Sequence, residues 1–140
     1  MKTASHLTGP AATARLNNGV EIPRLGLGVF RTEDGHAVRN AVAWALDAGY
    51  RHIDTARIYG NESGVGEALA EAKVPREEIF VTTKVWNDDL RRHRTREAVE
   101  ESLSRLGLDY VDLLLIHWPV AEAFVDAWKA MEDLYGEGKA

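Results

Sequence analysis

Three ionisable residues of this 140-residue chain each stand at the end of an apolar, β-branched run. Asp54 closes a run that starts at residue 51, Lys84 closes one from residue 79, and His117 closes one from residue 111. The spacings are about 30 and 33 positions, which is the length of one strand-helix-strand unit. A repeat of that length brings the ends of successive parallel strands together on one rim. A carboxylate, an ammonium and an imidazole should therefore converge there.

Tyr59 lies on the loop after Asp54 and adds a phenol to this set. An ammonium beside a phenol favours the phenolate form, which makes the phenol a proton donor suited to carbonyl chemistry near neutral pH. Each residue alone has an ordinary interpretation as a solvated, capping or half-buried packing residue. Ionisable groups that end several β-rich runs are instead typical of the catalytic rim of a parallel α/β barrel.

Composition limits the classes of function. The net charge is −5, with 45% hydrophobic and 28% charged residues, which is ordinary for a soluble globular domain and gives no basic footprint for nucleic acid. The short basic cluster at residues 91–94 is interpreted as a solvated helix entrance. There is no cysteine, which excludes disulfides, thiolate metal ligands and a thiol nucleophile. We predict no metal site.

The ends of the chain and its hydropathy suggest no membrane partner. No apolar stretch approaches membrane-spanning length, and the first residues lack the apolar segment of a signal peptide. A cytoplasmic location is the expectation. Residues 1–13 are small and polar and are predicted to form a flexible arm, followed by one domain over residues 14–140.

The order of elements predicts the fold class. Asn-Asn-Gly at residues 17–19 predicts a hairpin between residues 14–16 and 20–22, and a short strand is expected at residues 25–30. Apolar periodicity predicts four helices, over residues 38–46, 61–72, 95–106 and 124–135. Asn61 and Thr95 are the expected N-caps. Strands alternating with helices indicate an α/β fold with a parallel sheet and helices outside.

The last of these helices carries a stripe of large apolar residues. The stripe is predicted to face the core rather than a cofactor, and it consists of Phe124, Trp128, Met131 and Tyr135.

Three motifs resemble those of the aldo-keto reductase family, in order and at matching distances. Details such as Gly60-Asn61-Glu62 resemble the bacterial members similar to 2,5-diketo-gluconate reductases. The motifs are residues 49–56 (Gly-Tyr-Arg-His-Ile-Asp-Thr-Ala) with Tyr59-Gly60-Asn61-Glu62, residues 83–86 (Thr-Lys-Val-Trp) and residues 112–119 (Asp-Leu-Leu-Leu-Ile-His-Trp-Pro).

The resemblance implies an NADPH-dependent oxidoreductase that reduces small aldehydes or ketones to alcohols, with NADH as a possible cofactor. Tyr59 would be the general acid that protonates the carbonyl oxygen. Lys84 would activate the phenol and Asp54 would hold Lys84. His117 would bind and orient the substrate carbonyl. The natural substrate is not fixed by the sequence.

The resemblance also implies binding residues. Phe30, Trp86 and Trp118 correspond to apolar walls of the substrate pocket, beside His117, although ordinary core packing is an open alternative for these aromatic residues. Val29 and Asp54 correspond to positions where the nicotinamide end of the cofactor binds.

The family fold is a (β/α) barrel of the TIM type with eight strands and about 250 residues. This chain is expected to form a partial barrel, namely the hairpin and the first four β/α units. The inward side of residues 113–116 would lack partners and both sheet edges would be open, which favours self-association. Two hypotheses stay open. One is a truncated reductase that is inactive alone, and the other is a non-catalytic half-barrel or regulatory module that assembles with another chain.

Overall fold

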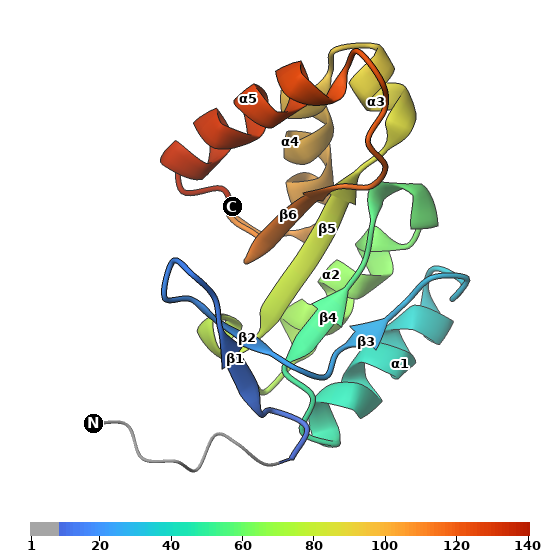
Figure 1. Cartoon of the computed structure of the whole chain (residues 1–140). Helices are drawn as coiled ribbons and strands as arrows, with labels where there is room; N and C mark the ends of the chain where they lie inside the picture. The colour runs from blue at the N-terminus through green and yellow to red at the C-terminus, as the bar shows by residue number, and fades with distance from the viewer. Residues whose placement is uncertain (1–8) are drawn as a thin grey trace.

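The computed structural model describes residues 9–140, and it begins with the predicted hairpin (Figure 1). The strands β1 (Thr13–Arg15) and β2 (Glu21–Pro23) pair antiparallel with Ala14 opposite Ile22, which confirms the hairpin to within one residue. Most of the arm expected over residues 1–13 lies outside the described residues. Of the rest, Ala12 is buried and Thr13 already belongs to β1.

The main sheet has four parallel strands in the order β3-β4-β5-β6, as the sequence predicted. The strands are shorter than the apolar runs, most of all β3, because the chain turns away after Val29 through a bond from the Thr32 amide to the Val29 carbonyl. Their bounds are β3 (Leu27–Gly28), β4 (His52–Asp54), β5 (Phe80–Val85) and β6 (Leu113–Ile116).

Helices connect the strands and cover one face of the sheet (Figure 1). All four predicted helices are confirmed to within about two residues at each end, as is the fold class. No helix within residues 9–140 is both long and apolar enough to cross a membrane. The helices are α1 (His36–Asp47), α2 (Glu62–Glu71), α3 (Asn87–Arg91), α4 (Thr95–Leu106) and α5 (Phe124–Gly136), with single 3₁₀ turns η2 (Arg57–Tyr59) and η3 (Arg76–Glu78).

The core lies between the sheet and these helices. Alternate strand residues such as Ile53, Val81 and Leu114 point toward the helices and are buried, because side chains alternate between the two faces of a strand. The predicted α1 stripe is buried at Val38, Val42 and Leu46. The opposite sheet face is less covered, and Leu115 is 37% exposed there. The hydrophobic effect thus holds the helices on one side only.

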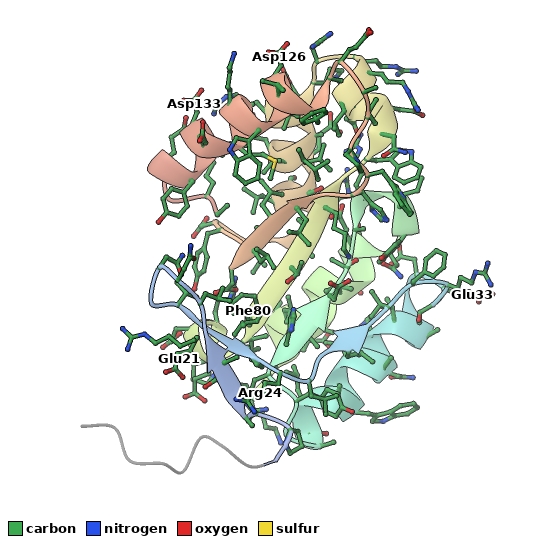
Figure 2. The ribbon with its side chains drawn as sticks, viewed as in Figure 1. Glu21, Arg24, Glu33, Phe80, Asp126 and Asp133 are labelled. Atoms are coloured by element: carbon green, nitrogen blue, oxygen red, sulfur yellow. The ribbon has the colours of Figure 1, made fainter. Side chains whose placement is uncertain are left out.

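The predicted stripe of α5 is wrong for three of its four residues. Phe124, Trp128 and Tyr135 are 43%, 56% and 65% exposed, and the buried face of α5 consists of Ala127, Met131 and Leu134. The small Ala127 lets α5 rest against its neighbours, which leaves the larger aromatic residues exposed beside that contact. Asp126 and Asp133 mark the outer side of the same helix in Figure 2.

Two of these exposed aromatic residues, Trp128 and Tyr135, border a groove. It has a volume of about 1140 Å³ and opens between the hairpin, β6 and α5. Its apolar lining includes Leu16, Val20, Leu113, Trp128 and Tyr135. The inward sheet face and the groove are therefore the least covered apolar surfaces of the described chain.

Of the two expected N-cap positions, the one at Asn61 is confirmed and the one at Thr95 is wrong. Arg94, not Thr95, occupies the cap position of α4, and Thr95 is its buried first residue. Asn61 does occupy the cap position of α2, but its side chain makes no capping bond. The Asp34 carboxylate accepts from the Gly64 amide instead, at 2.9 Å. The helix α3 was not predicted from the sequence, because its five residues are too few to show a helical period.

Gly66 marks the closest approach between α2 and α4. A Cβ at this position would lie 2.5 Å from the Leu106 carbonyl oxygen, and that backbone atom cannot move aside as a side chain could. We predict that Gly66→Ala lowers the free energy of unfolding by about 2 kcal/mol or more. Gly136→Ala is the control, because a Cβ there meets nothing within 4 Å. Urea unfolding monitored by circular dichroism measures both, and equal stabilities would contradict the close packing of α2 on α4.

Candidate active site

The parallel register of the sheet brings the predicted ionisable residues to one rim. Asp54 ends β4, Lys84 is the penultimate residue of β5, and His117 follows β6 directly. Asp54 pairs with Thr82, two positions before Lys84, so the Asp54 and Lys84 side chains share the face opposite the helices. The three strands thus deliver a carboxylate, an ammonium and an imidazole to one place.

The Lys84 ammonium is the centre of the site. Its Nζ lies 2.5 Å from Asp54 Oδ1, 2.9 Å from the Thr55 carbonyl oxygen and 3.3 Å from the Tyr59 hydroxyl. The Lys84 side chain is only 14% exposed, so these oxygen atoms take the place of water around the charge. Because the ammonium donates to the phenol oxygen, the hydroxyl hydrogen of Tyr59 is free to be donated elsewhere.

Tyr59 is placed by the short turn η2. Ala56 enters the turn in an extended conformation, and Gly60 leaves it with a left-handed φ of 69°, which glycine adopts without strain. The phenol ring meets the His117 ring edge-on, with centroids 5.9 Å apart. It also packs on the Phe30 ring at 5.2 Å. The four predicted residues therefore lie together at one rim of the sheet.

His117 lies among aromatic rings. Its centroid is 5.2 Å from that of Trp86 and 6.5 Å from that of Trp118. Partial burial lowers the pKa of His117, and the nearby Lys84 cation lowers it further, against an opposing effect of Asp54. The imidazole is therefore neutral at pH 7, with one N–H donor and one acceptor nitrogen. Its buried Nδ1 has no hydrogen-bond partner within residues 9–140.

The predicted wall residues contact Tyr59 or His117, whereas the Val29 side chain lies in the core. Phe30 and Trp118 are about 60% exposed and Trp86 is half-buried, so their rings contact the pocket without being core residues. Val29 is completely buried in the core. Its backbone amide donates to the Asp54 carbonyl at 3.1 Å. A cofactor contact at Val29 stays a prediction.

Charged residues that the sequence did not single out hold the tyrosine turn. Arg57 Nε lies 2.6 Å from Asp89 Oδ2 on α3, and its Nη1 lies 2.7 Å from Glu101 Oε2 on α4. Asp89 is buried, so this pairing satisfies a carboxylate that would otherwise be costly to bury. The partners stand far from Arg57 in the sequence, and no local spacing could have revealed them.

Glu62 supports the strand that carries Lys84. This carboxylate is 1% exposed and accepts from Thr83 Oγ1 at 2.7 Å. Its second oxygen is 2.7 Å from Arg105 Nη2 of α4. Glu62 therefore ties α2, β5 and α4 together directly behind the site. The sequence motif Gly60-Asn61-Glu62 included Glu62, but nothing in the motif indicated that Glu62 supports β5.

The arrangement is suited to proton transfer. The described part of the chain holds no group of three or more His, Asp or Glu side chains that could ligate a metal ion. A phenol that accepts a bond from an ammonium, beside a neutral imidazole, can give a proton to an oxygen atom placed between the two rings.

Comparison with known proteins identifies relatives of this chain. The model of the Aldo/keto reductase family matches residues 24–140. The chain is 59% identical over 124 residues to the 9,11-endoperoxide prostaglandin H2 reductase of Trypanosoma cruzi (strain CL Brener), which covers 89% of this chain and 44% of that protein. It is 53% identical over 127 residues to the glyoxal reductase of Bacillus subtilis (strain 168), with 91% and 46% covered.

A solved structure extends the comparison to the fold. The Bombyx mori aldo-keto reductase in complex with NADP superposes with a TM-score of 0.86 at 43% identity, over 95% of this chain and 49% of that one. The chain spans about half the length of the curated relatives it matches. Its four parallel β/α units correspond to part of their barrel. On its motifs, its fold and these matches, the chain belongs to the aldo/keto reductase family.

Proposed function

We propose that this chain is the catalytic, amino-terminal portion of an NADPH-dependent reductase that converts small aldehydes or ketones to alcohols. The observation that carries the proposal is the Lys84 ammonium, which contacts both the Asp54 carboxylate and the Tyr59 hydroxyl. His117 lies against the same phenol ring. This combination places a proton donor, its charge-stabilising cation and a second hydrogen-bonding group around one small space.

The aromatic surroundings of Tyr59 suit a small carbonyl substrate. Phe30 and Trp118 leave apolar ring faces exposed beside the half-buried Tyr59 and His117, and the apolar part of such a substrate can rest on these faces. A relative, the Bombyx mori aldo-keto reductase, was solved with NADP. When bound, the cofactor supplies a hydride to the carbonyl carbon. NADPH rather than NADH is proposed from the family resemblance.

The residues of this chain handle the proton and the charge. The neutral His117 imidazole donates a hydrogen bond that orients the carbonyl oxygen. As that oxygen gains negative charge, Tyr59 gives it the hydroxyl proton and becomes a phenolate. The Lys84 ammonium, 3.3 Å from the phenol oxygen, stabilises the phenolate, and Asp54 keeps the ammonium in place. Proton uptake from solvent restores Tyr59.

Short carbonyl compounds are the substrate class to test first. Aromatic rings lie around Tyr59, and the Lys84 charge beside it is paired with Asp54, so a small neutral aldehyde or ketone suits the space. One relative is named a glyoxal reductase, which makes glyoxal a reasonable first compound. The cytoplasmic location expected from the sequence stays a prediction.

A specific observation also supports the second hypothesis, assembly with another chain. Within residues 9–140, nothing covers the groove bordered by Trp128 and Tyr135 or the inward side of Leu115. Apolar surface of this extent favours association. We therefore propose that the 140-residue chain self-associates through this side and binds NADPH weakly by itself.

The first prediction concerns the proton donor. The 140 residues fused to the carboxyl-terminal half of the Bacillus subtilis glyoxal reductase provide a complete chain for the assay. Tyr59→Phe should lower kcat for glyoxal by about 10²–10⁴-fold while NADPH affinity stays unchanged, because the change removes a proton donor and little volume. Tyr135→Phe, on the exposed side of α5, is the control. Full activity of Tyr59→Phe would remove the phenol from the mechanism.

The second prediction concerns His117. Its pKa should lie below the ordinary value near 6.5, and Lys84→Met should raise it, because a repelling cation is lost and Asp54 is left unpaired. NMR titration of the imidazole in the 140-residue chain measures both values.

The same shift has a consequence for stability. Since the folded state binds this proton less readily than the unfolded state, His117 contributes stability above about pH 6.5. That contribution is lost as the pH falls through the folded-state pKa. His117→Gln should flatten this part of the pH dependence of unfolding. An upward shift of the His117 pKa in the parent chain would contradict the geometry.

The third prediction concerns assembly of the 140-residue chain. Sedimentation velocity should show species heavier than the 15.5 kDa monomer, and Trp128→Lys should shift the distribution toward the monomer. Trp44→Lys, at a 69% exposed tryptophan of α1, should not. A compact monomer that binds NADPH at micromolar concentration would show that the described residues need no covering partner.

A further inference from the structure

The side-chain amide of Asn61 makes no capping hydrogen bond to α2, the helix that follows it. The residue is completely buried, and its Nδ2 donates to the carbonyl oxygens of Val29 and Thr32, each at 2.9 Å. Its Oδ1 accepts from Thr55 Oγ1 at 3.2 Å. The orientation of the amide follows from these partners, because two carbonyl oxygens can only accept. The cap of α2 comes from Asp34 instead.

Both carbonyl groups held by Asn61 belong to one tight turn. The Thr32 amide closes this turn by donating to the Val29 carbonyl at 3.1 Å. Inside it, Arg31 has a left-handed φ of 61°, a conformation that residues other than glycine rarely adopt. The two bonds from Asn61 therefore stabilise a backbone shape that Arg31 itself disfavours.

The turn controls the position of one wall of the pocket. Phe30 stands in the turn next to Arg31, and its ring packs on the Tyr59 ring with centroids 5.2 Å apart. The third bond of Asn61 reaches Thr55, whose carbonyl oxygen accepts from Lys84. One side-chain amide thus joins the segment that carries Phe30 to the segment that carries the catalytic groups.

We propose that Asn61 is a positioning residue that fixes the Phe30 turn against Tyr59 and thereby sets the width of the carbonyl pocket. Its effect on substrate preference rests on the proposed reductase function. Its effect on the contact between the two rings does not. Loss of the amide should let the turn relax, move Phe30 away from Tyr59 and weaken substrate binding more than proton transfer.

The contact between the rings can be measured without a substrate. Among the aromatic pairs within residues 9–140, Phe30–Tyr59 is the one that joins a phenylalanine to a tyrosine. Selective labelling of both residue types should give a nuclear Overhauser effect between the rings, which Phe30→Leu assigns. Asn61→Ala and Asn61→Asp should abolish or strongly weaken it. Asn40→Ala and Asn40→Asp, at an exposed position of α1, should leave it unchanged.

A rescue experiment separates positioning from a general role in folding. Glycine adopts left-handed φ values readily, so Arg31→Gly should let the turn keep its shape without the two hydrogen bonds from Asn61. Adding Arg31→Gly to Asn61→Ala should restore much of the ring contact, which would not happen if Asn61 only filled space in the core.

Activity provides the last readout. In the fused chain, Asn61→Ala should raise KM for glyoxal about tenfold and change kcat much less. An unchanged ring contact in a folded Asn61→Ala chain would overturn the proposal, and so would unfolding of both Asn61 variants, which would make Asn61 a folding residue. A fused chain that reduces no carbonyl compound would refute the proposed function, whereas the ring contact would still decide the role of Asn61.

Discussion

The structure depends on one largely buried cation. Removing the Lys84 ammonium from water is costly unless oxygen atoms replace the lost hydration. The fold supplies them from three places: the end of β4, the backbone of Thr55 and the phenol of Tyr59. This is possible only because β4 and β5 run parallel in a register that pairs Asp54 with Thr82, two residues before Lys84 on β5. The register of the sheet therefore determines which side chains meet the Lys84 ammonium at the rim.

A second layer of polar contacts keeps the tyrosine turn in reach of that cation. Arg57 binds the turn to α3 and α4, Glu62 supports β5 from behind, and Asn61 ties the turn to the loop after β3. Each of these residues is buried or partly buried and has a charged or polar partner from another element. Tyr59 therefore lies on a short loop that polar contacts tie to α3, α4 and the loop after β3.

The sequence patterns correctly predicted the features that depend on residues close together in the chain. The ends of the strands, the parallel order and the convergence of Asp54, Tyr59, Lys84 and His117 follow from a repeat of about 30 residues. The aromatic stripe of α5 was mispredicted because helical spacing marks two possible apolar faces, and the packing of Ala127 against neighbouring elements chose between them. The roles of Arg57 and Asn61 depend on partners distant in the sequence, and periodicity carries no information about such pairs.

The central claim is that the ammonium of Lys84 is already held by its oxygen partners in this chain. A ¹⁵N–¹H correlation spectrum of the lysine side chains tests it directly, because hydrogen exchange is slow only for an ammonium that is bonded and shielded from water. The Lys84 signal should persist at neutral pH, where that of Lys129, 70% exposed, is lost to exchange. A Lys84 ammonium that exchanges as fast as Lys129 would contradict the account.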